Sequence, residues 1–180
     1  MNILIFGAPG SGESTLGQAL AESMDYFFMD TDDYFWLKSP VPYSRKRDTA
    51  EGLCLMRRDI ETHKNCVIAG SVCGWGDELI PYIDLSVWLQ TDTSIRIERI
   101  CEREERLFGC RAAPGGDMYR QFTAFLDYAK QYDTAGEEVR SLAQHSKWVK
   151  LLPCSTLLLD GAASVPENIA LITERIRDLT

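Results

Sequence analysis

The residues of this chain most suited to chemistry lie near its start, in the segment GAPGSGEST at positions 7–15. We call this segment the phosphate loop, because it matches the pattern G-x-x-x-x-G-K-[ST] at every fixed position except one, where Glu13 replaces the lysine. Glycines in such a loop let backbone N–H groups turn toward a polyphosphate, and the N-terminus of the next helix adds a positive dipole end. The loop predicts binding of a nucleotide and of Mg²⁺ (the latter at Ser14) through Gly7, Pro9, Gly10, Ser11, Gly12, Glu13, Ser14 and Thr15.

The carboxylate of Glu13 opposes the binding that the rest of the loop favours. A lysine here would reach the β- and γ-phosphates, whereas Glu13 repels them. At a separation of about 4 Å and an effective dielectric near 20, one unit-charge interaction is worth roughly 4 kcal/mol. That is large beside the ~8 kcal/mol of a micromolar complex. The sequence therefore predicts phosphoryl-transfer machinery that is impaired at Glu13, and tighter nucleotide binding when Glu13 is changed to lysine.

A group of carboxylates, Asp30-Thr31-Asp32-Asp33, follows a second apolar run. The carboxyl ends of parallel strands are where such sheets bind ligands. Asp30 and Asp32 are therefore predicted to bind the acceptor substrate, and Asp32 to hold Mg²⁺ or accept a proton from a hydroxyl. The alternative is that Asp32 or Asp33 caps the next helix, and for Asp33 the cap is the preferred interpretation.

Arginines recur at helical spacing at positions 96, 99, 103 and 106. Residues at this spacing lie near one face of a helix, so several guanidinium groups can approach one polyphosphate. Arg103 and Arg106 are the predicted catalytic and phosphate-binding members, and Arg96 is given the smallest role. Neighbouring glutamates leave open a salt-bridged face in solvent. Without nucleotide, we expect Arg103 or Arg106 to donate to Glu13.

Two loop-like stretches accompany these residues. The first, Pro40–Asp48, carries Arg45, Lys46 and Arg47, and we expect Arg45 and Arg47 to bind an anionic acceptor unless the triplet is simply solvated. The second, Arg106–Asp117, is rich in glycine and is predicted to be a lid. The acceptor-binding segment is expected at about residues 37–64.

The elements that must position these residues alternate between short apolar runs and longer helix-period stretches. This pattern predicts an α/β fold with a mainly parallel sheet. Strands are expected at 3–6, 26–29, 66–69, 85–89 and 156–159. Helices are expected at about 14–24, 49–64, 93–106, 118–132, 137–150 and 165–179, and a further helix is expected to contain 34–36.

Composition narrows the class of protein. With 180 residues, 45% of them hydrophobic, we expect one domain over 1–180. The net charge of -8 argues against nucleic-acid binding. The six cysteines are scattered and indicate a reduced, cytoplasmic protein, without a signal peptide or membrane span. The expected partner is a small-molecule acceptor, and the expected state is a monomer or weak homodimer.

Over nearly its whole length the chain resembles small P-loop kinases of the adenylate kinase and shikimate kinase group. The phosphate loop resembles their nucleotide loop, and Asp30-Thr31-Asp32 resembles the D-T-D of shikimate-kinase-like members. The resemblance extends to a third strand that ends at Gly70 beside the acceptor, an arginine-bearing helix around Arg99 and Arg103, and a turn at Gly161 beside the adenine. It implies ATP with Mg²⁺, a three-layer fold with helices on both faces of a five-stranded parallel sheet in the order 2-3-1-4-5, and a closing lid.

Three functions remain open from the sequence. The first is an ATP-dependent kinase for a small nucleotide or hydroxylated metabolite, impaired by Glu13. The second is a non-catalytic nucleotide-binding or regulatory protein that retains the kinase fold. The third is a structural or partner-binding domain in which Glu13 pairs with an arginine.

Overall fold

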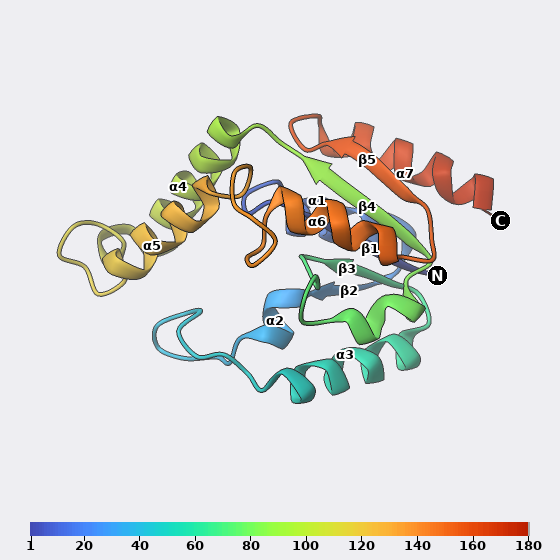
Figure 1. The fold of residues 1–180 in the computed structure, drawn as a ribbon, viewed down its shortest axis with the longest axis horizontal. Coiled ribbons are helices and arrows are strands. Elements are labelled where there is room, and N and C mark those ends of the chain that lie inside the picture. The colour runs from blue at the N-terminus through green and yellow to red at the C-terminus, as the bar shows by residue number, and fades with distance from the viewer. Residues whose placement is uncertain (180) are drawn as a thin grey trace.

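The structure is a computed structural model that describes residues 1–179, so Thr180 of the expected domain lies outside the described residues. Its centre is a five-stranded parallel sheet in the order β2-β3-β1-β4-β5 (Figure 1). The strands are β1 (Asn2–Gly7), β2 (Phe27–Asp30), β3 (Cys66–Ala69), β4 (Leu85–Gln90) and β5 (Thr156–Asp160). The expected fold class and strand order are confirmed.

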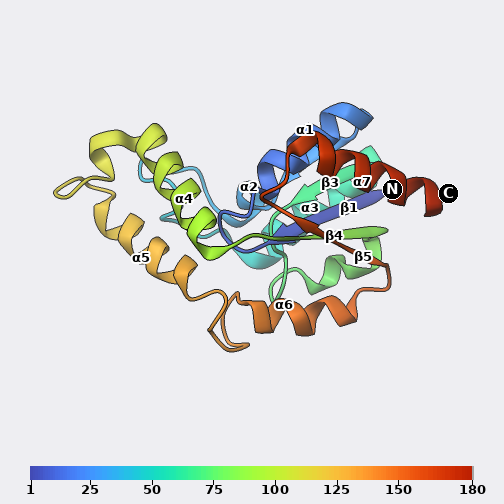
Figure 2. The same cartoon turned by 90° about the horizontal axis from the view of Figure 1, so that it is seen from above.

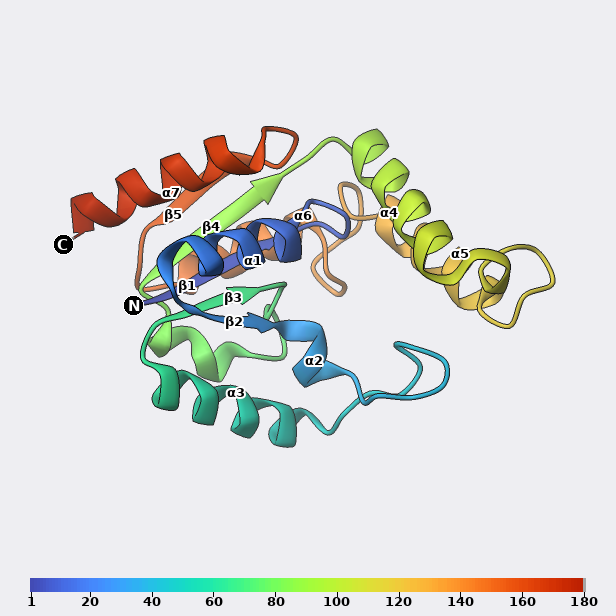
Figure 3. The same ribbon diagram turned by 180° about the vertical axis from the view of Figure 1, so that it is seen from behind.

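All strand pairs in the sheet are parallel, and its central strands are apolar on both faces. In β1, Ile3 and Ile5 face one layer, while Leu4 and Phe6 face the other, and all are fully buried. Helices α1 (Glu13–Met24) and α7 (Val165–Leu179) cover the first face (Figure 3). Helices α3 (Thr49–His63) and α6 (Leu142–Trp148) cover the second.

The remaining helices lie at the carboxyl edge of the sheet. Helix α2 (Thr31–Phe35) follows β2 directly. Helices α4 (Thr93–Phe108) and α5 (Tyr119–Lys130) form an arm, residues 93–130, that extends away from the sheet (Figure 2). Short 3₁₀ turns occupy Asp77–Tyr82, Gly109–Arg111 and Val149–Leu151. The expected lid segment, 106–117, is therefore the outer end of a longer arm.

The base of the arm is fixed by Arg96, whose side chain is 0% exposed. Its guanidinium donates to the carbonyls of Thr91 (3.0 Å) and Ala129 (3.2 Å) and to the carboxylate of Asp133 (2.7 Å). It also lies over the ring of Tyr132. The alternative left open for these arginines, a salt-bridged face in solvent, does not hold for Arg96, because the end of α5 packs over the base of α4.

The helix expected from Glu137 begins later, at Leu142. Ser141 is the N-cap, since its hydroxyl accepts the N–H of Gln144 at 3.0 Å. Residues 137–140 consequently belong to the loop between the arm and α6, and Arg140 lies in that loop. Across residues 1–179, no helix combines the length and the apolar character that a membrane crossing requires.

Candidate active site

The phosphate loop connects the carboxyl end of β1 to α1 and has the conformation its glycines allow. Gly12 occupies the N-cap of α1 with φ of 102°, a left-handed conformation that glycine adopts without strain. The Ser11 N–H donates to Ala8 O at 3.0 Å and closes the turn. The loop therefore presents the N-terminus of α1 to a cavity of about 420 Å³, which we call the loop cavity.

The loop cavity brings the arm and the phosphate loop together. Arg99, Arg103 and Arg106 line it from α4, opposite loop residues 10–15. The turn after β5 completes the wall at Gly161, where any Cβ would lie 2.5 Å from Ser11 O. Arg99 holds this corner, since its Nη1 donates to Gly161 O at 2.9 Å. The predicted sites at Arg103, Arg106, Gly161 and the loop thus lie around one cavity.

The expected contact between Glu13 and Arg103 or Arg106 is wrong. Arg103 donates to Glu104 at 2.8 Å and lies over the ring of Phe125, and Arg106 is exposed at the cavity edge. Both side chains extend from the outer half of α4, and neither is bonded to Glu13 among the described contacts. The partner of Glu13 comes from a different element.

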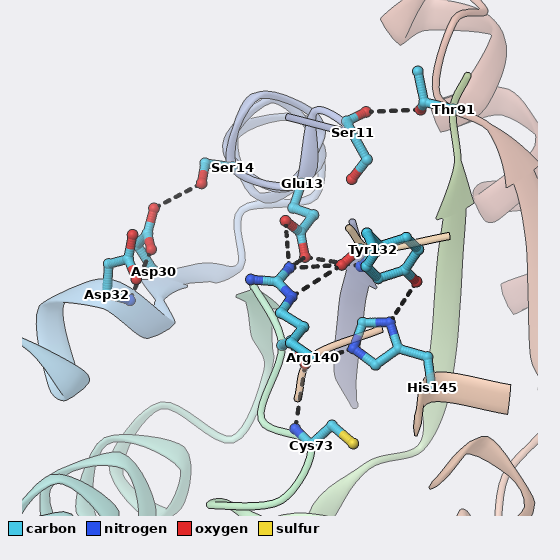
Figure 4. Close-up of polar contacts among 12 residues, drawn as sticks. Ser11, Glu13, Ser14, Asp30, Asp32, Cys73, Thr91, Tyr132, Arg140 and His145 are labelled. Atoms are coloured by element: carbon cyan, nitrogen blue, oxygen red, sulfur yellow. Dashed lines mark hydrogen bonds and ion pairs between the residues drawn. The ribbon is translucent and has the colours of Figure 1, made fainter. Parts of the chain in front are cut away.

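That partner is Arg140, as Figure 4 shows. Its Nη2 lies 2.7 Å and 2.9 Å from the two carboxylate oxygens of Glu13 and 2.6 Å from Gly7 O. Its Nε also donates to Gly7 O at 3.2 Å, while the Gly7 N–H donates to Glu13 at 2.8 Å. The two side chains and the first glycine of the loop form one hydrogen-bonded unit, with only 11% of Glu13 and 26% of Arg140 exposed.

Burial has the largest effect on the pKa of Glu13. It raises the pKa of Glu13 to about 7, against the lowering effect of the Arg140 charge and of hydrogen bonds from Arg140 and Gly7. Arg140 remains charged: burial lowers its pKa, but the charge and hydrogen bond of Glu13 and the neighbouring Tyr128 together raise it above its ordinary value. Burial also raises the pKa values of the adjacent Tyr128 and Tyr132, which therefore stay neutral at ordinary pH.

This shift predicts how pH acts on stability. Because the folded-state pKa of Glu13 lies above its ordinary value of 4.5, the stability linked to its protonation is present below 4.5 and lost as the pH rises through about 7. Glu13→Gln removes this titration, so its stability relative to wild type should increase over that range by at most about 3 kcal/mol, at about 1.4 kcal/mol per pKa unit. Urea unfolding of both proteins from about pH 5 to pH 8 measures it. A difference that does not change with pH would contradict the prediction.

The carboxylates after β2 connect the phosphate loop to a second cavity. Ser14 Oγ donates to Asp30 Oδ2 at 2.8 Å, and the Asp32 N–H donates to Asp30 Oδ1 at 3.0 Å. Asp30 is thus the N-cap of α2, and the preferred assignment of that cap to Asp33 is wrong. Burial and then the neighbouring Asp30 raise the pKa of Asp32, although its side chain borders open space.

The second cavity, of about 290 Å³, is called the aspartate cavity here. Asp30, Asp32 and Asp33 line it together with Trp36 and Tyr43. Trp36, which ends α2, is thus part of the wall of this cavity.

The other predicted acceptor residues lie outside the walls of the aspartate cavity. Arg47 donates to Tyr34 O and to Glu51, which ties α2 to α3. Arg45 is exposed in the loop that follows Pro42. Gly70 packs against Thr31, where a Cβ would lie 2.0 Å from the hydroxyl oxygen. The basic triplet therefore supplies structure at Arg47 and leaves Arg45 in solvent.

The arm also contacts the loop beside the aspartate cavity. Arg111 Nη2 donates to Pro40 O at 3.2 Å, and Gln121 Nε2 donates to Pro42 O at 2.7 Å. The same Arg111 pairs with Asp117 across the glycine-rich turn. The arm thus lines the loop cavity and rests on the 40–42 loop beside the aspartate cavity.

A buried histidine secures the segment that carries Arg140. His145 is fully buried, with Nε2 2.8 Å from Ser71 Oγ and Nδ1 2.8 Å from the Tyr132 hydroxyl. Burial, and then the charge of Arg140, lower its pKa to about 3, so the ring is neutral. This geometry agrees with a structural role for His145 and joins β3, the base of the arm and α6.

Sequence reasoning missed Arg140 because it placed this residue inside a continuous helix. The pattern Ser141-Leu142-Ala143-Gln144 is a capping signature, S-x-x-Q, which marks a helix start at that point. Recognising it would have moved Arg140 into a loop, the usual place for a binding residue. Its approach to Glu13, 127 residues away in the chain, has no local signal.

A family model described as an AAA domain matches residues 3–108, more than half of the chain. The chain belongs to this family. The matched part of the AAA domain contains the phosphate loop, the Asp30 cluster and α4, whereas Arg140 follows it.

Curated relatives of this AAA-domain chain include named kinases. The Bacillus subtilis (strain 168) protein "Uncharacterized protein YqaC" is 40% identical over 168 residues, 93% of each chain. A cytidylate kinase of Methanococcus vannielii is 30% identical over 58% of this chain and 66% of its own length. A shikimate kinase of Moorella thermoacetica is 28% identical over 81% of this chain and 92% of its own.

A solved structure agrees with the fold. The shikimate kinase of Bacteroides thetaiotaomicron superimposes with a TM-score of 0.58 at 16% identity, over 98% of both chains. At that identity the likeness shows the fold alone, which is the three-layer arrangement of Figure 1.

Proposed function

We propose that this protein is an ATP- and Mg²⁺-dependent kinase that phosphorylates a small molecule held in the aspartate cavity. The observation that carries the proposal is the hydrogen bond from Ser14 to Asp30, which joins the phosphate loop to the carboxylates of the second cavity. A phosphoryl donor in the loop cavity and an acceptor in the aspartate cavity would meet at this bond. The kinase names of the relatives support the same class.

The residues present suit Mg²⁺. Ser14 offers a hydroxyl, and Asp30 and Asp32 offer carboxylate oxygens, which are the donors that Mg²⁺ prefers. The residues described include no cluster of three or more His, Cys, Asp or Glu that could hold a metal alone. That fits Mg²⁺, which usually takes one or two carboxylates and completes its shell with water and substrate phosphates. When bound, the ion would neutralise charge on the phosphates.

The walls of the aspartate cavity indicate the acceptor class. Trp36 and Tyr43 present aromatic surface to a flat ring, while Asp30 and Asp32 present acceptors to amino or hydroxyl groups. A nucleoside monophosphate offers both, and a cyclic polyol offers hydroxyls alone. We therefore infer a nucleotide acceptor, with a hydroxylated ring acid as the alternative.

A transfer assay tests the proposal directly. With γ-labelled ATP and Mg²⁺, the label should pass to a pyrimidine or purine monophosphate more readily than to shikimate or gluconate. The Glu13→Lys form should be assayed in parallel, since Glu13 weakens the donor site. No transfer to any acceptor by either form would contradict the kinase proposal.

The role of Asp32 gives a sharper prediction. Asp32→Asn should lower the turnover of the Glu13→Lys form by about 100-fold or more, the range for losing a general base, and change ATP affinity by less than about threefold. Turnover and calorimetric ATP affinity are measured separately. The matched control is Asp127→Asn, at an exposed position of α5. A loss of folding stability alone would mean that Asp32 serves only the fold.

A second candidate function rests on the Glu13 and Arg140 unit. Its carboxylate occupies the position from which the pattern's lysine reaches phosphate. A protein that binds nucleotide weakly and regulates a partner would keep this unit and show no transfer. Calorimetric binding of ATP to wild type without transfer in either form would favour it.

A further inference from the structure

Arg140 has no assigned role, although it is the cation nearest the base of the phosphate loop. It lies outside the stripe of α4 arginines and enters from the loop before α6. Its guanidinium contacts the first glycine of the phosphate loop through two nitrogens and position 13 through one of them. A positive charge is therefore present beside position 13, supplied by another part of the chain.

The hydrogen bonds of Arg140 leave one nitrogen unused. Nε and Nη2 donate to Gly7 and Glu13, whereas Nη1 has no partner among residues 1–179. In Figure 4 this nitrogen is on the side of the Arg140 guanidinium toward Asp30 and Asp32. The charges of Arg140 and Asp32 also influence each other's pKa. Arg140 thus lies behind Glu13, which lines the loop cavity, on the side where the aspartates of the other cavity lie.

The backbone around Arg140 is held firmly. Ser141, the next residue, is fully buried, and its hydroxyl donates to Gly136 O at 2.6 Å while capping α6. The Leu142 N–H donates to Tyr132 O at 2.8 Å. Since Tyr132 also bonds the buried His145, the chain on the C-terminal side of Arg140 is fixed to the core. A guanidinium held this way loses little further freedom when it binds phosphate.

We propose that Arg140 supplies the phosphate-binding cation that position 13 lacks, with Glu13 holding the guanidinium at the loop until nucleotide arrives. The inference rests on the proposed function, because it assigns a residue to the same donor site. Polyphosphate would replace Glu13 as the acceptor of the Nη2 bonds and engage Nη1 as well. An arginine suits this exchange, since its planar fork bonds carboxylate and phosphate oxygens alike.

The decisive comparison is between two variants that both lack the charge of Glu13. In Glu13→Gln, Arg140 is freed from its carboxylate; in Glu13→Gln/Arg140→Met, no cation remains beside the loop. Calorimetric titration with Mg-ATP should show at least about tenfold weaker binding by the double variant, the loss expected for charged hydrogen bonds. Equal affinity would overturn the proposal. Thermal unfolding of both proteins first establishes that they fold.

A second pair tests whether Arg140 substitutes for the lysine of the pattern. In the Glu13→Lys background, Arg140→Met should weaken Mg-ATP binding by less than about threefold, because a lysine now reaches the phosphates. An effect as large as in the glutamine background would show that Arg140 acts independently of position 13 and would overturn the proposal.

The Glu13→Lys protein also separates this inference from the proposed function. If it binds Mg-ATP while Arg140→Met has no effect in the glutamine background, the kinase proposal stands and the role of Arg140 falls. If Glu13→Lys itself binds no Mg-ATP, the donor site was assigned wrongly and both fall together.

Discussion

Replacing Arg96 with methionine should lower the free energy of unfolding by about 2 to 4 kcal/mol, the cost of leaving buried hydrogen-bond acceptors without their donor. The fully buried guanidinium bonds the carbonyls of Thr91 and Ala129 and the carboxylate of Asp133. Methionine fills much of the volume but leaves these oxygens without their donor. Urea unfolding measures the change.

The matched control is Arg175→Met on α7, where the side chain is 37% exposed and its Asp178 contact is 4.0 Å long. That change should cost no more than about 0.5 kcal/mol, as for most surface substitutions. Arg96 joins α4 to the end of α5. Its loss should therefore increase the rate of amide hydrogen exchange in the arm more than in the sheet. A loss for Arg96→Met no larger than for the control would contradict this account of the base of the arm.

Changing Glu13 to lysine should strengthen Mg-ATP binding by at least tenfold, about 1.4 kcal/mol. The substitution removes a carboxylate from the loop cavity and places an ammonium where the pattern expects one. Repulsion from Arg140 limits the gain in the free protein, and the negative charge of bound polyphosphate offsets that repulsion. Calorimetric titration of the two forms measures the affinity.

The control for this prediction is Glu22→Lys, the same charge change on the exposed side of α1. It alters the net charge equally but lies away from the loop cavity, so its effect on Mg-ATP affinity should stay within about threefold after screening by salt. If Glu13→Lys bound Mg-ATP no better than Glu22→Lys, position 13 would have no part in the donor site.

The sheet and the phosphate loop could be predicted because their signals are local. Residues 66–69 form a run of four buried side chains, which is typical of a parallel strand, and the glycines at 10 and 12 have the positive φ that the loop pattern requires. Each signal needs only its own neighbours in the chain. The strand order then followed from the family resemblance.

The arginines could be predicted as a group but not individually. Spacing places Arg96 and Arg103 near one face of α4 and says nothing of what packs there. At the base of α4, the end of α5 covers Arg96, whereas farther out the face borders the loop cavity at Arg103. The difference lies in tertiary contacts between segments more than thirty residues apart.

The sequence also could not predict which charged residues pair with each other. Glu13 has several candidate cations in the sequence, and the one it contacts lies 127 residues away, in a loop where the sequence pattern predicts a helix. Arg47 likewise has the right charge for an anionic acceptor but bonds Tyr34 and Glu51. Composition shows which charges exist, and only the fold decides which of them are already neutralised by the protein.

The contacts of Arg111 with Pro40 and of Gln121 with Pro42 have a kinetic consequence. The arm lines the loop cavity and is bonded to the 40–42 loop beside the aspartate cavity, so a movement of the arm would act on the donor and acceptor sites together. Under the proposed function, the phosphoryl group passes directly between two bound ligands in a ternary complex, without a phosphorylated side chain as an intermediate. Double-reciprocal plots of initial velocity against the concentration of one substrate, at several fixed concentrations of the other, should then give intersecting lines and not parallel ones.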